Sequence, residues 1–162
     1  MRSDLATLCF IVKDGRVLLI RKKRGLGAGK VNAPGGKLES GETAQAAAVR
    51  ETQEEVGVTP LGLQECGRLH FQFTDGYRLE CTVFLAEDLS GAPVETAEAA
   101  PFWVEIDDIP YDKMWQDDRH WLPLALAGHT VEVACDFDGD RMLSLDLKVD
   151  GKDAKNGNDG TE

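Results

Sequence analysis

Glu51, Glu54 and Glu55 lie close together in the stretch GGKLESGETAQAAAVRETQEEVGV, which runs from residue 35 to 58. Positions i, i+3 and i+4 of a helix share one face, so a helix here would bring the three carboxylates together. Like charges at this spacing weaken a helix unless a positive charge lies among them. Mg²⁺ prefers carboxylates, waters and substrate phosphates as ligands, so the pattern indicates a divalent-cation site. The alternative is a solvated acidic face on which Arg50 pairs locally.

The residues around these glutamates extend the pattern to a longer motif. It reads G-x5-E-x7-R-E-U-x-E-E-x-G-U, where U is apolar, and the matching positions are Gly36, Glu42, Arg50, Glu51, Glu54, Glu55, Gly57 and Val58. This 23-residue segment resembles the signature of the Nudix family. Thr52 fills one apolar place of the signature, a departure that we expect to affect packing rather than chemistry.

The Nudix resemblance implies a fold and a reaction class. The implied fold is an αβα sandwich around a mixed β-sheet, and the reaction is hydrolysis of a nucleoside diphosphate linked to another group. Bound Mg²⁺, or Mn²⁺, would neutralise phosphate oxygens and lower the pKa of the attacking water. Glu54 and Glu55 are the candidates for the base that takes the proton of this water, and Glu51 is expected to be a metal ligand. Arg50 is expected to orient a neighbouring carboxylate, with Glu42 as its partner.

Stretches outside the signature narrow the expected substrate. RKKRGLGAGKVN, PVETAE and IPYDKMWQDDRHWLPL are similar to the eukaryotic, MutT-related family of oxidised-purine nucleoside triphosphatases. Together with a final hairpin, this resemblance covers roughly residues 5 to 149. It implies hydrolysis of 8-oxo-dGTP or 2-hydroxy-dATP to the monophosphate and pyrophosphate, a reaction that sanitises the nucleotide pool. Attack on the α or on the β phosphorus stays open.

The same resemblance assigns roles to individual side chains. Asn32, Asp117 and Asp118 would read the purine edge, because an amide both donates and accepts and because one of two adjacent aspartates can hold its proton. Trp115 would stack on the base, which is worth on the order of 1–3 kcal/mol. The expected substrate-binding residues are Thr7, Lys22, Asn32, Gly36, Lys37, Trp115, Asp117 and Asp118. The expected metal ligands are Gly35, Glu51, Glu54, Glu55 and Glu98.

Ordinary structural interpretations and other activities stand beside this hypothesis. Asp117 and Asp118 alone would suit a helix N-cap with an acidic first turn, and Trp115 a core aromatic. Leu26 and Pro34 stand where the family carries aromatic residues, which puts the substrate preference in question. The alternatives are a Nudix hydrolase for ordinary dNTPs, ADP-ribose or a dinucleotide, a non-catalytic nucleotide-binding Nudix module, and a structural acidic scaffold.

The elements that must position these residues are many strands and few helices. Strands are expected near 5–12, 16–21, 31–33, 67–73, 78–87, 102–106, 130–137 and 142–149, with hairpin turns at Asp14-Gly15 and Asp138-Gly139-Asp140. The clearest helix runs from Thr43 to Val56, with Ser40 or Thr43 as its cap and Gly57 at its end, and a second one from Asp117 to Leu126. We expect one domain, residues 1–149, and a disordered polar tail, residues 150–162.

The net charge and the cysteines limit which classes of partner and which cellular compartment we expect. The net charge of -11 over 162 residues argues against binding of a nucleic-acid polymer. Residues 1–50, however, carry ten Lys or Arg against four Asp or Glu, which suits a small polyanion such as a nucleotide. No apolar run is long enough to span a membrane. The separated Cys9, Cys66, Cys81 and Cys135 are expected to be reduced core thiols of a cytoplasmic protein, which we expect to be a monomer.

Overall fold

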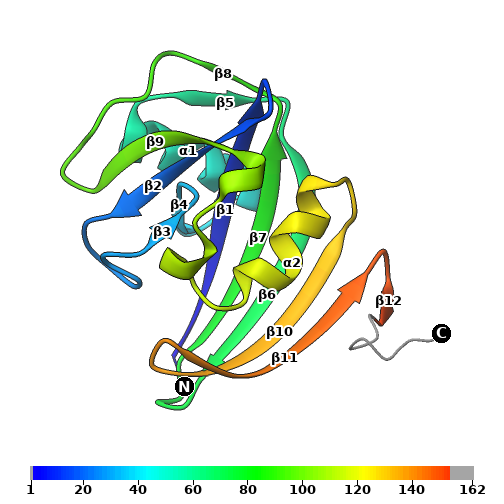
Figure 1. The fold of residues 1–162 in the computed structure, drawn as a ribbon. Helices are drawn as coiled ribbons and strands as arrows, with labels where there is room; N and C mark the ends of the chain where they lie inside the picture. The colour runs from blue at the N-terminus through cyan, green and yellow to red at the C-terminus, as the bar shows by residue number, and fades with distance from the viewer. Residues whose placement is uncertain (1, 154–162) are drawn as a thin grey trace.

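The computed structural model describes residues 2–153 (Figure 1). Its helices are α1 (Ala44–Val56) and α2 (Asp118–Leu126), and two 3-10 turns lie at Ile106–Asp108 and Tyr111–Lys113. Its strands are β1 (Ser3–Lys13), β2 (Arg16–Lys22), β3 (Val31–Asn32), β4 (Gly35–Lys37), β5 (Thr59–Leu61), β6 (Gln64–Phe73), β7 (Arg78–Ala86), β8 (Asp88–Ser90), β9 (Ala99–Glu105), β10 (Val131–Asp138), β11 (Arg141–Val149) and β12 (Lys152–Asp153).

Most of the strands form one mixed sheet. Its order is β12-β11-β10-β6-β7-β1-β2-β3, with β4 paired to β1 and β9 paired to β2, while β5 and β8 form a separate pair. The β1–β7 and β6–β10 pairs are parallel and the other pairs are antiparallel. The mixed sheet expected from the sequence is therefore confirmed.

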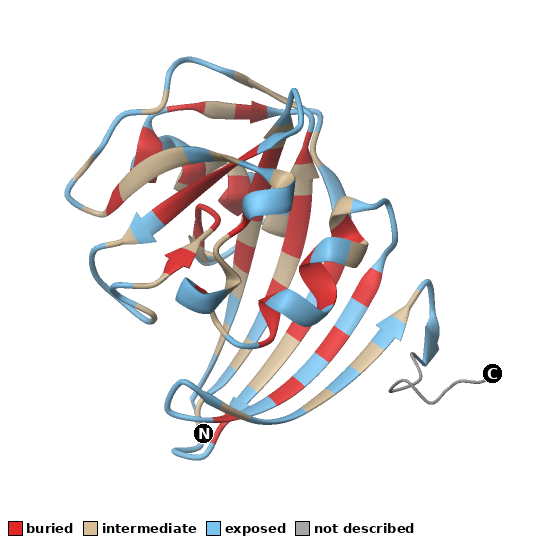
Figure 2. Ribbon diagram, viewed as in Figure 1, coloured by how far each residue is buried: buried red, intermediate tan, exposed pale blue. Residues whose placement is uncertain are grey.

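The two faces of this sheet carry two separate hydrophobic cores. On β1, Phe10 packs into the core that contains Trp121 of α2, whereas Cys9 and Ile11 pack into the core that contains Ala48 of α1. Successive side chains of a strand point to opposite faces, so burial of all three puts protein on both sides of β1. Figure 1 shows the two helices on opposite faces of the sheet, and this is the predicted αβα sandwich. Figure 2 shows that the central strands are the most buried, while β10 alternates between buried and exposed residues.

Local sequence signals define the ends of α1. The Thr43 hydroxyl accepts a hydrogen bond from the Ala46 N–H at 3.1 Å, so Thr43 rather than Ser40 caps the helix. Gly57 ends it in the left-handed region, at φ 77°. The predicted helix is thereby confirmed, and its acidic face lies against β4, where the Gly35 N–H donates to Glu55.

The pair Gly35–Gly36 lies in a strand, although two adjacent glycines would also allow a tight turn. The two residues lie in β4, antiparallel to β1, with Gly36 opposite Thr7. Neither glycine has a positive φ. A Cβ added to Gly35 would lie 2.9 Å from the carbonyl carbon of Thr7, and one added to Gly36 would lie 2.8 Å from Glu51 Oε1. Glycine is needed here for close approach of the chain rather than for an unusual backbone conformation.

The predicted hairpins at Asp14-Gly15 and Asp138-Gly139-Asp140 join β1 to β2 and β10 to β11. At the end of the described chain, Asp150 accepts from the Thr130 N–H at 2.9 Å, and β12 pairs with β11. The rest of the tail predicted to be disordered lies outside the described residues, and the predicted domain boundary stays a prediction. Neither α1 nor α2 is long and apolar enough to cross a membrane.

Candidate active site

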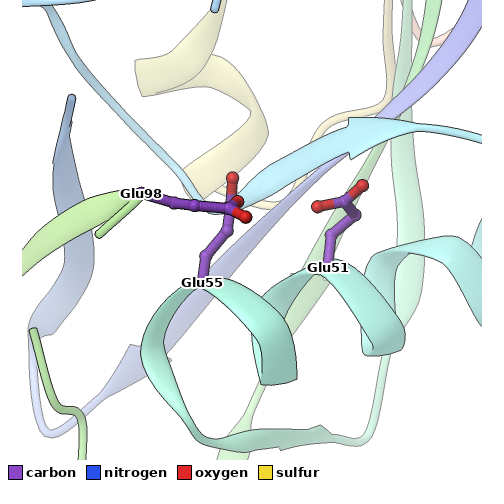
Figure 3. Close-up of side chains that lie close together, drawn as sticks. All are labelled: Glu51, Glu55 and Glu98. Atoms are coloured by element: carbon purple, nitrogen blue, oxygen red, sulfur yellow. The ribbon is translucent and has the colours of Figure 1, made fainter. Parts of the chain in front are cut away.

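Three carboxylates converge between α1 and the start of β9. Glu51 and Glu55 project from successive turns of α1, and Glu98 directly precedes β9 (Figure 3). The pairing of β9 with β2, in which Ala99 lies opposite Lys22, carries Glu98 toward the helix. One oxygen of each glutamate lies within 4.8 Å of the other two. The fold therefore brings together three of the residues predicted as metal ligands from distant parts of the chain.

Glu54, also predicted as a ligand or base, lies apart from this cluster. Its side chain is 52% exposed, and its Oε1 accepts from Arg50 Nη1 at 3.2 Å. Consecutive helix positions are rotated by about 100°, so Glu54 and Glu55 cannot point the same way. A part in catalysis for Glu54 stays a prediction.

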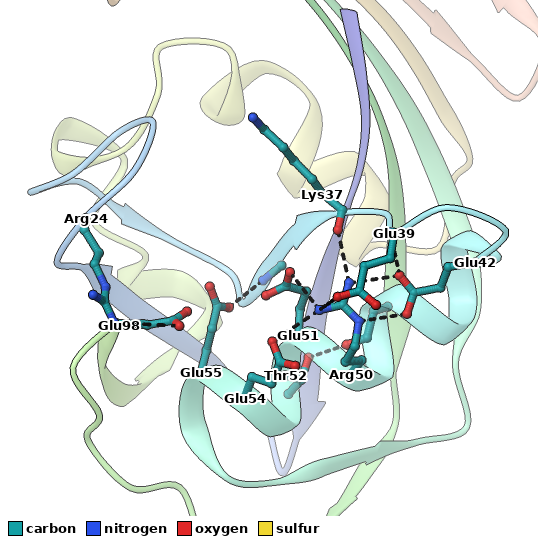
Figure 4. A network of polar contacts seen from close by, with 12 residues as sticks. Arg24, Lys37, Glu39, Glu42, Arg50, Glu51, Thr52, Glu54, Glu55 and Glu98 are labelled. Carbon is teal, nitrogen blue, oxygen red and sulfur yellow. Dashed lines mark hydrogen bonds and ion pairs between the residues drawn. The ribbon is translucent and has the colours of Figure 1, made fainter.

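Arg50 holds the acidic network beside the cluster (Figure 4). Its Nε and Nη2 donate to the two oxygens of Glu42 at 2.8 and 2.9 Å, which is the pairing expected from the sequence. Its Nη1 donates to Glu51 at 3.2 Å, and its Nη2 also donates to the Lys37 carbonyl at 3.1 Å. The hydrogen bonds from Arg50 lower the pKa of Glu42 to about 2. Glu42 therefore stays ionised and fixes the guanidinium that orients Glu51.

The cluster of Glu51, Glu55 and Glu98 fits a divalent metal ion. Burial raises the pKa of Glu55 to about 8, although the Gly35 N–H donates to its Oε1 at 2.8 Å and acts in the opposite direction. Burial also raises the pKa of Glu51, against the lowering effect of Arg50. Two carboxylates as close and as buried as Glu51 and Glu55 ionise together only when positive charge compensates them. A set of oxygen donors is the set that hard cations prefer.

A cavity of about 940 Å³ shares Gly35 and Gly36 with this acidic region. Its size is at the upper end of the range of small-molecule sites. All of the residues predicted to bind substrate line it: Thr7, Lys22, Asn32, Gly36, Lys37, Trp115, Asp117 and Asp118. These residues come from β1, β2, β3, β4 and the start of α2, so only the tertiary fold brings them together.

Asp117 and Asp118 are buried at one wall of this cavity. Asp117 Oδ2 accepts from the Trp121 indole N–H at 2.8 Å, and Asp117 makes no side-chain capping bond to α2. Among the described residues, Asp117 Oδ1, Asp118 Oδ2 and the Thr7 hydroxyl have no hydrogen-bond partner. Burial raises the pKa of both aspartates, and the charge of Asp117 raises that of Asp118 further. Buried polar atoms without partners are costly, so a ligand with complementary polar groups would satisfy them.

Trp115 faces this cavity among aromatic residues that were not among the predicted site residues. Its indole packs edge-on against Phe137 at 5.2 Å and against Phe73 at 6.1 Å between ring centroids. Phe71 and Tyr77 also line the cavity. The alternation in HFQF, residues 70–73, puts Phe71 and Phe73 on the same face of β6, and this signal could have placed both in the site.

Comparison with known proteins agrees with this geometry. The NUDIX domain model matches residues 2–125. The chain is 46% identical over 125 residues to the oxidized purine nucleoside triphosphate hydrolase of Danio rerio, covering 76% of this chain and 80% of the relative. It is 41% identical over 148 residues to the Mus musculus protein of the same name, covering 90% of this chain and 95% of the relative.

The fold recurs in the MutT protein of Bacillus halodurans, with a TM-score of 0.79 at 24% sequence identity, over 92% of this chain and 99% of that one. The matched domain covers the acidic cluster and most of the cavity. The chain belongs to the NUDIX family, as the motif from Gly36 to Val58 predicted.

Proposed function

We propose that the protein is a metal-dependent nucleoside triphosphate pyrophosphohydrolase that acts on oxidised purine nucleotides. The observation that carries this function is a cavity of about 940 Å³ with two buried aspartates in its wall, which adjoins a cluster of three carboxylates. Relatives at 46% and 41% identity bear the name of oxidized purine nucleoside triphosphate hydrolases, which supports the same substrate class. The products are the nucleoside monophosphate and pyrophosphate, and the reaction removes damaged precursors from the nucleotide pool.

The polar wall of the cavity explains which nucleobase the site would select. Asp117 and Asp118 can share a proton because burial raises the pKa of both. A protonated carboxyl donates and an ionised one accepts, so the pair can match purines that differ in donor and acceptor pattern. The Asn32 Oδ1 accepts from the Ala33 N–H at 2.8 Å, which fixes its amide so that its NH₂ group can donate to the base. Trp115 supplies the stacking face.

The acidic region accounts for the chemistry. Mg²⁺, or Mn²⁺, held by Glu51, Glu55 and Glu98 would neutralise the phosphate oxygens and acidify the attacking water. Arg50 keeps Glu51 oriented toward this region through its pairing with Glu42. Lys22 and Lys37 add positive charge at the cavity, where the phosphate chain must pass from the base pocket to the carboxylates.

A substrate panel tests the proposed activity. Purified protein with Mg²⁺ is incubated with 8-oxo-dGTP, 2-hydroxy-dATP, dGTP, dATP and ADP-ribose, and pyrophosphate or monophosphate release is measured. We expect kcat/KM to be highest for the oxidised triphosphates. Equal, slow turnover of dGTP and 8-oxo-dGTP would reject the sanitising function and leave the hydrolase class intact. Hydrolysis in ¹⁸O-labelled water assigns the phosphorus that is attacked.

Comparison of Glu54→Gln with Glu55→Gln separates catalysis from mere nucleotide binding. We propose that both variants lose turnover, and that Glu55→Gln also loses metal affinity because Glu55 belongs to the carboxylate cluster. Unchanged rates in both variants would favour a non-catalytic binding module.

Leu26 gives one specific reason to keep a second Nudix substrate under test. It lines the cavity and is 46% exposed, at a place where the oxidised-purine family carries an aromatic ring. A smaller side chain there leaves room for a base or substituent of another shape. We also propose that the protein works in the cytoplasm, because its four cysteines are free thiols, as a reducing compartment favours. That it is a monomer stays a prediction.

A further inference from the structure

Lys30, which is not among the predicted site residues, contacts the indole ring of Trp115. The Nζ of Lys30 lies over the indole, 5.4 Å from its centroid. Trp115 lines the cavity, whereas Lys30 does not, so the ammonium covers the indole outside the cavity. The ammonium therefore does not occupy the part of the indole that lines the cavity.

Both the side chain and the backbone of Lys30 are held by neighbouring residues. Its ammonium pairs with Asp140 at 3.1 Å, and Asp140 lies in the turn between β10 and β11. Its carbonyl accepts from the Lys22 N–H at 3.0 Å, and its N–H donates to the Gly27 carbonyl at 2.9 Å. The Lys30 side chain is only 25% exposed, so its attraction to the indole is less screened than that of a surface lysine.

Two further contacts restrict Trp115. A Cβ added to Gly27, whose φ is +80°, would lie 2.8 Å from the indole nitrogen, so the loop backbone lies against that edge of the ring. The next residue, Gln116, accepts from the Met142 N–H at 2.7 Å, which ties the chain at Trp115 to the start of β11. The indole is therefore enclosed by the loop between β2 and β3 and by the hairpin of β10 and β11.

We infer that Lys30 and Asp140 are positioning residues for Trp115. Their ion pair joins the β2–β3 loop to the β10–β11 turn and holds a cation over the outer side of the indole, which fixes the plane on which the purine stacks. This inference rests on the proposed function for its substrate. A ring that is already fixed loses less conformational entropy on binding, so the pair contributes to base affinity. The carboxylate cluster is built from other elements, so the pair leaves the hydrolytic step unchanged.

The test compares Lys30→Met, Lys30→Arg and Asp140→Asn with the wild type. We expect Lys30→Met to raise KM for 8-oxo-dGTP about three- to tenfold, the range of a partly buried cation–π contact, with kcat within about twofold. The dissociation constant of 8-oxo-dGMP, measured in EDTA, should rise by the same factor. Asp140→Asn should show a smaller rise, and Lys30→Arg, which keeps the cation, should restore the wild-type values.

Arg141→Met is the matched control. Arg141 is the first residue of β11, next to Asp140, and pairs with Asp138 at 3.7 Å, so its loss removes a cation without touching the indole. Unchanged KM and dissociation constant in Lys30→Met, or a fall in kcat alone, would overturn the inference. An equal effect in Arg141→Met would overturn it as well, since net charge would then be the cause.

A second measurement separates this inference from the proposed function. The indole N–H resonance of Trp115 in the free protein is assigned by its loss in Trp115→Phe. In Lys30→Met we expect this resonance to shift or broaden while those of Trp103 and Trp121 stay in place. An unmoved Trp115 resonance would overturn the positioning role. A moved resonance in a protein that hydrolyses no oxidised purine would uphold the positioning role and reject the proposed substrate.

Discussion

Gly36 lies directly against the carboxylate of Glu51, with 2.8 Å between Glu51 Oε1 and the place that a Cβ on Gly36 would occupy. The strand β4 thus lies so close to α1 that a side chain at position 36 would collide with Glu51. The missing side chain leaves the Glu51 carboxylate in position to meet Glu55 and Glu98.

Gly36→Ala should therefore displace the Glu51 carboxylate. We expect Mn²⁺ affinity to fall at least about tenfold, with a similar loss of kcat, because displaced supporting groups typically cost 10–100-fold in metal affinity. Titration of Mn²⁺ followed by calorimetry measures the change. Gly41→Asn is the control, because Gly41 lies before the same helix, a Cβ added there would meet no atom within 4 Å, and asparagine tolerates its φ of +79°. Equal Mn²⁺ affinity in Gly36→Ala and the wild type would contradict the prediction.

Arg50→Lys should break the network that orients Glu51. An ammonium cannot donate in parallel to both oxygens of Glu42 and still reach Glu51, as the guanidinium does. We expect kcat/KM to fall about 10–100-fold while the nucleotide dissociation constant in EDTA changes little. Arg68→Lys is a matched control, since Arg68 pairs with Glu65 on the exposed side of β6. A loss confined to nucleotide binding would show that Arg50 serves the base pocket instead.

Asp118→Asn should change how stability depends on pH. Burial and the neighbouring Asp117 raise the pKa of Asp118, so above the pKa of an unfolded aspartate the native protein holds more protons than the unfolded chain. The free energy of unfolding of the wild type therefore falls as pH rises through this range. The amide of Asp118→Asn does not titrate, so the difference, variant minus wild type, should increase as pH rises above about 4, the pKa of an unfolded aspartate.

Urea unfolding of both proteins at several pH values measures this difference. Asp136→Asn, on the exposed face of β10, is the control and should run parallel to the wild type. A pH-independent difference for Asp118→Asn would mean that the buried carboxyl ionises as easily in the folded protein as in the unfolded chain.

Thr52→Val tests the one departure from the apolar places of the signature. Thr52 is fully buried, and its hydroxyl donates to the Ala48 carbonyl at 2.7 Å within α1. That carbonyl already belongs to a helix, so loss of the hydroxyl removes one hydrogen bond without leaving a buried partner unpaired, and the free energy of unfolding should change by less than about 1.5 kcal/mol. Turnover should stay at the wild-type level. A marked fall in kcat without loss of stability would show that Thr52 contributes to the chemistry.

Short-range signals explain which parts of the site could be predicted. The spacing of Glu51 and Glu55, the capping hydroxyl of Thr43 and the left-handed Gly57 all act within a few residues, so they define α1 and its acidic face without help from the rest of the chain. The same spacing suggested Glu54 as a third member of the cluster. Glu98 lies 43 positions further along the chain than Glu55, so no local spacing pointed to it, and only the family resemblance predicted it as a ligand.

The sequence by itself therefore determined the helix, its family signature and the residue types suited to a metal and a purine. Only the tertiary structure decided which of these residues meet. The pairing of β9 with β2 brings Glu98 to α1, the close approach of β4 to β1 and α1 requires Gly35 and Gly36, and the β10–β11 turn carries Asp140 to Lys30. The physical reason is that strand pairing and packing join residues that are distant in sequence. The local preferences of a segment for helix or strand do not determine which distant segment it will contact.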